Sequence, residues 1–339
     1  MTKPKVGLLL GDPTGIGPEI VAKLLTRPDV HEHADLVVIG DRRVFEMGQK
    51  IAGVSLAARV VQRIEDAGFG GGAIPLVDFP GVPPEELTLG QLSAKAGKSV
   101  LEVLAFTLDL ARGGQIDAVV FAPFNKQAMH LGGSPFPDEL HFMADRLQWR
   151  GHISEINVLD NLWTSRVTSH LGLAEVSALI TTQGVYNAII LIHGALRIAG
   201  VKEPRLAVAA LNPHGGEGGL FGREEIDAIT PSIEQARSEG IQTQGPFPAD
   251  TIFLRVRGGA YDAVVSMYHD QGQIAMKLMG FERGVTVQGG LPVPITTPAH
   301  GTAFDIAGQG KANSEGLWQA FVLASRMAAN QKRLQGAKS

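Results

Sequence analysis

Short runs rich in β-branched residues alternate with helix-like stretches along almost all of this chain. The clearest runs predict strands over residues 5–10, 35–40, 117–123, 166–171, 205–211 and 262–268. This alternation is typical of parallel strands joined by helical crossovers, because parallel neighbours need a long connection. We therefore predict an α/β fold. No glycine- or proline-rich segment has the length of a flexible tether, so two domains would be joined through strands.

Length, composition and charge limit the function classes. With 339 residues, 44% of them hydrophobic and 19% charged, the chain can bury a large core and form two domains or one large α/β unit. The 30 basic and 34 acidic residues give a net charge of -4. This balance lacks the basic surplus that binding to a phosphate backbone requires, so we expect no nucleic-acid partner.

The chain has no cysteine, so any metal ion must be held by His, Asp or Glu. The apolar run near residue 8 is too short for a signal-peptide core. The longest apolar stretch, residues 185–201, is interrupted by His193 and Arg197 and predicts a buried helix rather than a membrane span. We expect a cytoplasmic protein without a membrane partner.

Three histidines follow predicted strands and precede or lie near glycines. His170, His214 and His269 each stand at the end of a buried run. Ligands of open α/β sheets bind at the carboxyl ends of strands, so the three imidazoles could meet at one point and hold a catalytic metal ion. A single histidine is more often a satisfied surface or core group, and spacing alone does not decide between the two interpretations.

Two charged side chains near these histidines have functional and structural interpretations. Asp250 orients a ligand imidazole, holds the metal ion itself or caps a helix. Lys277 lies eight residues after His269, about two turns if the segment is helical. Beside a divalent cation Lys277 would be a proton-transfer group, whereas without that context it would be a solvated helix lysine.

The two ends of the chain carry glycine-rich segments. Residues 11–20 read as a strand, a tight turn and a helix start, but Ile20 stands where a dinucleotide fingerprint requires glycine or alanine. Asp12 and Thr14 in this turn either contact a ligand or shape a cleft. The segment from His300 to Asn313 suits backbone approach to a flat ligand such as adenine, and a glycine-rich surface loop is the alternative.

Five motifs together carry a family resemblance: "GDPTGIGPEI", "LNPHGGEGGLFGREE", "GPFPADT", "MYHDQGQ" and "HGTAFDIAGQGKAN". They occur in order over essentially the whole chain, and they resemble the 4-hydroxythreonine-4-phosphate dehydrogenase family of vitamin B6 biosynthesis. The first and last also resemble the isocitrate and isopropylmalate dehydrogenases. The resemblance implies an isocitrate/isopropylmalate dehydrogenase-like fold of two α/β domains with a cleft between them. One domain would comprise residues 1–124 and 285–339, and the other residues 125–284.

The resemblance also implies a homodimer with its active site at the subunit interface, NAD or NADP as hydride acceptor, and a divalent metal ion. We expect zinc first, with magnesium, manganese and cobalt as alternatives. It implies the following roles: metal ligands His170, His214 and His269; catalytic residues Lys277 and Asp250; cofactor contacts His300, Gly301, Thr302, Ala303, Asp305 and Asn313; substrate contacts His141, Thr286 and Asp12.

Two departures from the family pattern concern the substrate. The family's Gly-His-Thr-Glu motif is replaced by "DELHFMADRL", in which His141 is a partial substitute. Thr286 and Ile295 stand where the family has asparagine and arginine, which removes a charged contact to an anionic group. These changes predict a paralogue that oxidises another hydroxy acid, a sugar-acid phosphate or a ring dihydrodiol.

The predicted reaction is oxidation of a secondary alcohol with NAD(P), with or without decarboxylation. Two rivals remain. A metal-dependent hydrolase or lyase would use the same histidines without a nicotinamide, and a ligand-binding paralogue would need neither metal nor catalysis.

Overall fold

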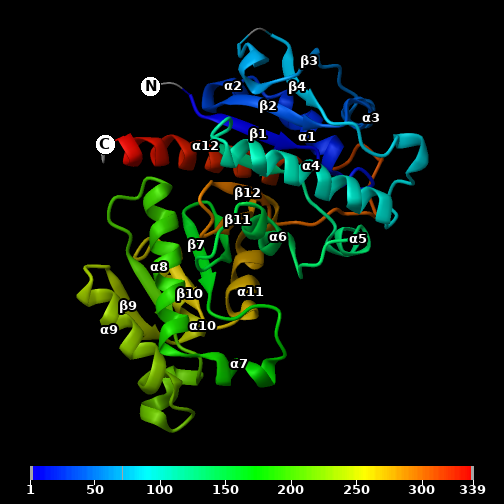
Figure 1. Ribbon diagram of the computed structural model, residues 1–339. Helices are drawn as coiled ribbons and strands as arrows, with labels where there is room; N and C mark the ends of the chain where they lie inside the picture. Colours follow the sequence, from blue (N-terminus) through cyan, green and yellow to red (C-terminus); the bar gives the residue numbers. More distant parts are fainter. Residues whose placement is uncertain (1–2, 71, 337–339) are drawn as a thin grey trace. The chain divides into compact units, whose positions relative to one another are not determined.

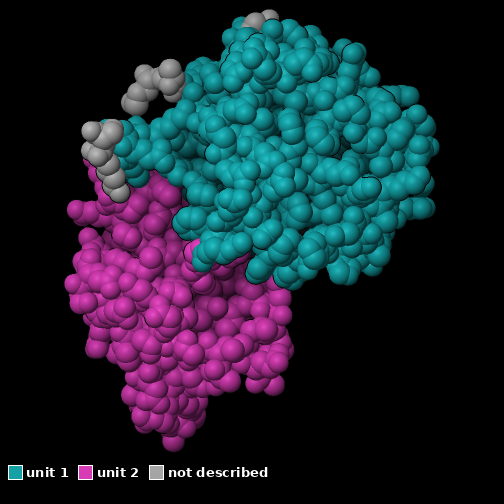
Figure 2. All heavy atoms as spheres, in the orientation of Figure 1, with its two compact units in different colours: residues 1–150, 285–287, 291–339 teal, residues 151–284, 288–290 magenta. Residues whose placement is uncertain are grey.

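The computed structural model describes residues 3–70 and 72–336, and the chain divides into two compact units (Figure 2). Unit 1 comprises residues 1–150, 285–287 and 291–339, and unit 2 comprises residues 151–284 and 288–290. The first boundary between the units follows residue 150, later than the boundary expected at residue 124. The reason is that α5 (Lys126–Leu131) and α6 (Glu139–Arg146) pack on α4 (Ala94–Arg112) of unit 1.

The sheet of unit 1 has the strand order β3-β4-β2-β1-β5-β12-β11. Its neighbouring strands are parallel except for β11, which runs antiparallel to β12. Parallel strands buried on both faces read as continuous apolar runs, and "DLVVIG" in β2 is one of them. The strands are β1 (Lys5–Leu9), β2 (Asp35–Gly40), β3 (Ala58–Val61), β4 (Ile74–Asp78), β5 (Ala118–Phe121), β11 (Val285–Gly289, shared with unit 2) and β12 (Ile295–Pro298).

Helices cover the sheet of unit 1 (Figure 1). α4 begins where the Ser93 hydroxyl accepts a hydrogen bond from the Ala96 amide, and it packs its apolar side chains on β1, β2 and β5. The long C-terminal helix α12 packs on β1, β5 and β12. The remaining helices of this unit, besides α5 and α6, are α1 (Gly17–Leu25), α2 (Val30–His33) and α3 (Arg42–Ala52); α12 spans Glu315–Gly336.

Unit 2 has the strand order β6-β7-β10-β8-β9, in which β7, β10, β8 and β9 are parallel and β6 pairs antiparallel with β7. The apolar helix predicted between residues 185 and 201 is α8, which packs on β6, β7 and β10. The strands are β6 (Ser154–Leu159), β7 (Leu162–Arg166), β8 (Leu206–Ala209), β9 (Thr243–Phe247) and β10 (Ala263–Ser266). The helices are α7 (Leu173–Leu179), α8 (Thr182–Ile198), α9 (Thr230–Ser238), α10 (Ala249–Arg257) and α11 (His269–Gly280).

Five of the six predicted strands are confirmed as β1, β2, β5, β8 and β10, but the strand predicted over residues 166–171 is wrong. β7 ends at Arg166. Beyond it, His170 has a left-handed backbone conformation with φ of 38°, so a strand could not have continued through residue 170. Among the described residues, no single helix is long and apolar enough to cross a membrane; the bent pair α7–α8 meets the criteria of length and composition.

Candidate active site

Four of the predicted site residues follow four neighbouring strands of unit 2. His170 follows β7, His269 follows β10, His214 follows β8 and Asp250 follows β9. These strands are parallel, so their carboxyl ends lie at one edge of the sheet, about 5 Å from one strand to the next. The spatial order β7-β10-β8-β9 differs from the order of these strands along the sequence, so the sequence does not predict which of these residues are neighbours.

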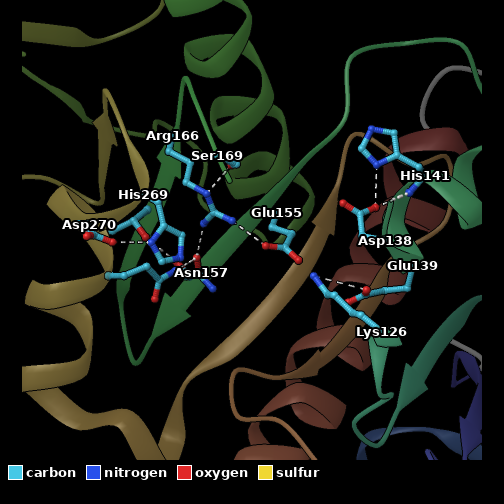
Figure 3. Close-up of polar contacts among 12 residues, drawn as sticks. Lys126, Asp138, Glu139, His141, Glu155, Asn157, Arg166, Ser169, His269 and Asp270 are labelled. Atoms are coloured by element: carbon cyan, nitrogen blue, oxygen red, sulfur yellow. Dashed lines mark hydrogen bonds and ion pairs between the residues drawn. The ribbon is translucent and has the colours of Figure 1, made fainter. Parts of the chain in front are cut away.

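The structure brings two of the three histidines together. The ring centroids of His170 and His269 are 5.9 Å apart, and Nδ1 of His269 lies 2.8 Å from the Asp270 carboxylate (Figure 3). When that nitrogen donates its proton to the carboxylate, Nε2 keeps a lone pair for a metal ion. The His214 side chain is exposed on its own loop. Within residues 3–70 and 72–336 of one chain, no group of three or more His, Asp or Glu side chains is placed to hold a metal ion.

Three predicted site residues have a strained backbone. His170, His214 and Ala303 have φ values of 38°, 55° and 43°, in the left-handed region that side chains other than glycine rarely adopt. Such strain costs of order 1–3 kcal/mol per residue and concentrates at functional sites. It persists only when neighbouring contacts hold it.

Polar side chains hold the loop that carries His214 and the start of α11, which carries His269. The carboxylate of Glu225 accepts hydrogen bonds from the backbone amides of Leu211 and Asn212 at 2.9 and 2.7 Å. The side chain of Gln271 accepts from the Met267 amide at 2.8 Å and donates to the Ala210 carbonyl at 3.0 Å. Gln271 therefore ties the end of β10 to the end of β8.

The predicted catalytic residues of unit 2 lie on two helices. α11 contains both His269 and Lys277, so the helical spacing expected between them is present, and the Lys277 side chain is exposed. Asp250 lies in the first turn of α10, where a carboxylate is favoured by the helix dipole. The capping position belongs to Pro248, so Asp250 is not the N-cap residue that the structural alternative required.

Asp12 lies at the carboxyl edge of the unit 1 sheet and is 1% exposed. Its Oδ1 accepts hydrogen bonds from the backbone amide and the hydroxyl of Thr14, both at 2.8 Å. Burial raises the pKa of Asp12, and the hydrogen bonds from Thr14 oppose this only in part. In the described part of the chain, Oδ2 is buried and has no hydrogen-bond partner. A ligand that donates a hydrogen bond would fit this atom.

The predicted nucleotide segment joins the first turn of the chain. The Thr302 carbonyl accepts from the Ile16 amide at 3.1 Å, and a Cβ on Gly15 would lie 2.9 Å from Thr302. Burial lowers the pKa of His300, so its ring is neutral at pH 7. Apart from its two chain neighbours, no atom of the described residues lies within 4 Å of a Cβ built on Gly301. A neutral aromatic ring beside open backbone fits a flat nucleotide base.

Other predicted cofactor residues have structural partners. The side-chain oxygen of Asn313 accepts from the Glu315 amide at 2.9 Å and so begins α12, while Asp305 is exposed. The loop is fixed to α1, because the Lys23 ammonium donates to the carbonyls of Gly310 and Ala312.

The predicted substrate residues of unit 1 lie apart along the chain. Nδ1 of His141 on α6 is 2.6 Å from the Asp138 carboxylate (Figure 3). Half of the His141 side chain is exposed. Thr286 is buried in β11 opposite Thr297 of β12. Ile295 is fully buried in the apolar core of unit 1, so its side chain packs and does not face a ligand.

Sequence reasoning missed two polar residues. Lys126 follows β5 in "APFNK", and its ammonium lies 3.5 Å from the Glu139 carboxylate. Arg166 ends β7 and is buried among polar side chains. The rule that found the histidines, a polar residue after a buried strand, would have found both. Arg166 was missed because the strand was expected to begin there.

A family model described as "Pyridoxal phosphate biosynthetic protein PdxA" matches residues 32–324. The chain belongs to this family. A protein of Pseudomonas aeruginosa named "Putative 4-hydroxythreonine-4-phosphate dehydrogenase 2" is 51% identical over 326 residues, which cover 96% of this chain and 97% of that protein. A Clostridium botulinum protein named "Putative D-threonate 4-phosphate dehydrogenase" is 37% identical over 96% of this chain and 97% of its own length.

Solved structures agree with the family. A 4-hydroxythreonine-4-phosphate dehydrogenase from Klebsiella pneumoniae superposes with a TM-score of 0.86 at 35% identity and covers 96% of this chain and 98% of its own. A terephthalate 1,2-cis-dihydrodiol dehydrogenase from Burkholderia xenovorans gives 0.67 at 31% identity over 95% and 98% of the two chains. A β-decarboxylating dehydrogenase from Thermococcus kodakarensis gives 0.50 at 14% identity over 100% and 98%, which concerns the fold alone. The predicted isocitrate/isopropylmalate dehydrogenase-like fold is confirmed.

Proposed function

We propose that this chain is a cytoplasmic, NAD(P)-linked and divalent-metal-dependent dehydrogenase. Its substrate would be a small hydroxy acid carrying a phosphate, oxidised at a secondary alcohol, with or without decarboxylation. The relatives named for hydroxythreonine phosphate and threonate phosphate support the substrate class. The pair of imidazoles at the carboxyl edge of unit 2 is the observation that carries the metal site.

His170 and His269 would hold a divalent metal ion, with zinc as the first expectation because imidazole suits it. When bound, the ion would lower the pKa of the substrate hydroxyl and stabilise negative charge on its oxygen. The Asp270 carboxylate would fix the ring orientation of His269 through Nδ1.

Lys277 would move the proton of the substrate hydroxyl, and Asp250 would assist it. Lys277 and His269 lie on the same helix, about two turns apart, so their backbone positions are fixed relative to each other. In unit 1, His300 and Gly301 would receive the flat base of the cofactor. The unpartnered oxygen of Asp12 would accept a hydrogen bond from the substrate.

A homodimer would complete the metal site. One chain supplies no group of three ligands among its described residues, so we propose that a second copy contributes the third. Large apolar side chains are exposed on α7 and just before it, in the loop after β8 and on α11, and such side chains are candidates for a partner surface. They are Leu171, Leu173, Leu220, Phe221, Ile274 and Leu278.

The test is absorbance at the NADH band with NAD+ or NADP+ and a divalent metal ion. The substrates would be 4-hydroxythreonine 4-phosphate, D-threonate 4-phosphate, an unphosphorylated hydroxy acid and a cis-dihydrodiol. Turnover that depends on metal and disappears in His269→Ala supports the proposal and names the substrate class. Absence of turnover and of NAD(P) binding by calorimetry would refute it and favour the hydrolase or lyase.

Mixing inactive variants tests the shared site. If His170 and His214 of one site come from different subunits, mixed dimers of His170→Ala and His214→Ala contain one intact site and regain activity. Mixed dimers of His170→Ala and His269→Ala regain none, because those two residues lie in the same chain. If neither mixture regains activity, all three histidines of a site come from one chain.

A further inference from the structure

Arg166 is a charged side chain only 5% exposed at the carboxyl end of β7. Its guanidinium donates to the side-chain oxygen of Asn157 at 2.9 Å, to the Glu155 carboxylate at 2.6 Å and to the Ser169 hydroxyl at 2.6 Å (Figure 3). A buried cation is costly unless it is paired and hydrogen-bonded, and Glu155 supplies the opposite charge.

The β6–β7 hairpin explains how these groups meet. Asn157 pairs with Thr164 in the antiparallel register, and the same register extended by two residues sets Glu155 opposite Arg166. Residues two apart share a face of the strand, so Asn157 and Glu155 both face the guanidinium. The β6–β7 hairpin therefore fixes the orientation of the Arg166 guanidinium.

One branch of this network reaches His170. Ser169, which accepts from Nε of Arg166, directly precedes the strained His170. Thr168 is also held, because its hydroxyl donates to the Met267 carbonyl at 2.9 Å. The hydrogen bond to Ser169 thus holds the left-handed turn that aims the His170 ring.

The other branch reaches His269. The side-chain oxygen of Asn157 accepts from both Arg166 and the Gln273 amide. Gln273 lies one helical turn after His269 on α11. The same guanidinium therefore restrains the elements that carry both imidazoles, and with them the 5.9 Å separation of the rings.

We propose that Arg166 is a positioning residue that sets the spacing of His170 and His269 and thereby the affinity for a divalent metal ion. This inference rests on the proposed metal site. Arg166 does not touch the ion; it acts through Ser169 on one side and through Asn157 and Gln273 on the other. A lysine in its place keeps the charge but cannot reach all three acceptors, because it lacks the planar fork.

The experiment measures Co²⁺ binding by calorimetry and the visible Co²⁺ spectrum for the full-length chain and its Arg166→Lys variant. We expect Arg166→Lys to bind Co²⁺ about 10- to 100-fold more weakly, with an altered spectrum. Ser169→Ala and Gln273→Ala, which cut one branch each, should weaken binding to a smaller extent. All titrations are made well below the unfolding midpoint of each variant, so that lost stability alone leaves the affinity unchanged.

Arg205→Lys is the matched control. Arg205 also forms a forked ion pair, with Asp262, but this pair lies at the amino ends of β8 and β10. Arg205→Lys should bind Co²⁺ like the unmodified chain. The inference is overturned if Arg166→Lys and both branch variants bind Co²⁺ as tightly as this control. If Arg166→Lys does not fold, the Co²⁺ affinities of Ser169→Ala and Gln273→Ala, compared with that of Arg205→Lys, test the inference. An unmodified chain that binds no Co²⁺ refutes the metal site itself.

Discussion

Replacement of Glu225 by alanine should destabilise the loop that carries His214. Glu225 is 3% exposed, and its carboxylate accepts the backbone amides of Leu211 and Asn212 and the side-chain amide of Asn212. Alanine leaves the two backbone amides without their acceptor. The side-chain amide of Asn212 keeps a second acceptor in Glu224 at 2.7 Å.

The magnitude follows from these two amides. A buried donor left without a partner costs about 1–3 kcal/mol. Leu211 and Asn212 are half-buried, so water partly replaces the carboxylate and each amide should cost near the lower limit. We expect Glu225→Ala to lower the free energy of unfolding by about 2 kcal/mol. Glu225→Gln, which keeps one oxygen for both backbone amides, should cost about 1 kcal/mol.

Urea unfolding followed by circular dichroism measures this effect, and amide hydrogen exchange of residues 210–222 locates it. Glu234→Ala on the exposed face of α9 is the control, and it should stay within about 0.5 kcal/mol of the unmodified chain. The reasoning is refuted if Glu225→Ala unfolds like this control and the loop amides exchange no faster.

Four further predictions follow from packing and protonation. A Cβ on Gly97 of α4 would lie 1.8 Å from the Ala128 carbonyl, so Gly97→Ala should cost about 1–3 kcal/mol in thermal unfolding. Gly194→Ala of α8 should instead add about 0.5–1 kcal/mol, because among the described residues no atom outside its own helix backbone and its two neighbours lies within 4 Å of the added Cβ. His300 has a pKa below 6.5 in the folded chain, so the unfolded chain binds the proton first. Stability is therefore complete above about pH 6.5 and falls as the pH decreases toward the folded pKa, and His300→Gln should reduce this loss in urea titrations compared at about pH 7.5 and about pH 5.5. The raised pKa of Asp12 has the opposite effect on stability. The unfolded chain loses this proton first, so the free energy of unfolding decreases as the pH rises above 3.8. Asp12→Asn should raise the unfolding midpoint at neutral pH but not in strong acid, and an unchanged midpoint at both would contradict it.

Local sequence patterns predicted the class of the fold because buried parallel strands are continuous apolar runs. They did not predict β4, which is as long as β1 but contains Pro75 and lies within a segment rich in glycine and proline that is typical of a loop. Neither the order β7-β10-β8-β9 nor the register of β6 on β7 can be read locally, since both depend on contacts between distant residues. The three histidines were predicted as candidates from their positions after strands, whereas the proximity of His170 to His269 depends on the topology.

The buried polar contacts behind the histidines raise the question of why a loop should be held by charged groups at all. Taking Arg166 and Glu155 out of water has a desolvation cost, and apolar side chains of similar volume could stabilise the hairpin equally well. Apolar contacts, however, are non-directional. A guanidinium donates along fixed directions, and it can hold Ser169 and Asn157 at set positions on two different elements. The network therefore fits a role in orientation better than a role in stability, and a substitution that preserves packing but removes the fork should affect the imidazole pair more than the fold.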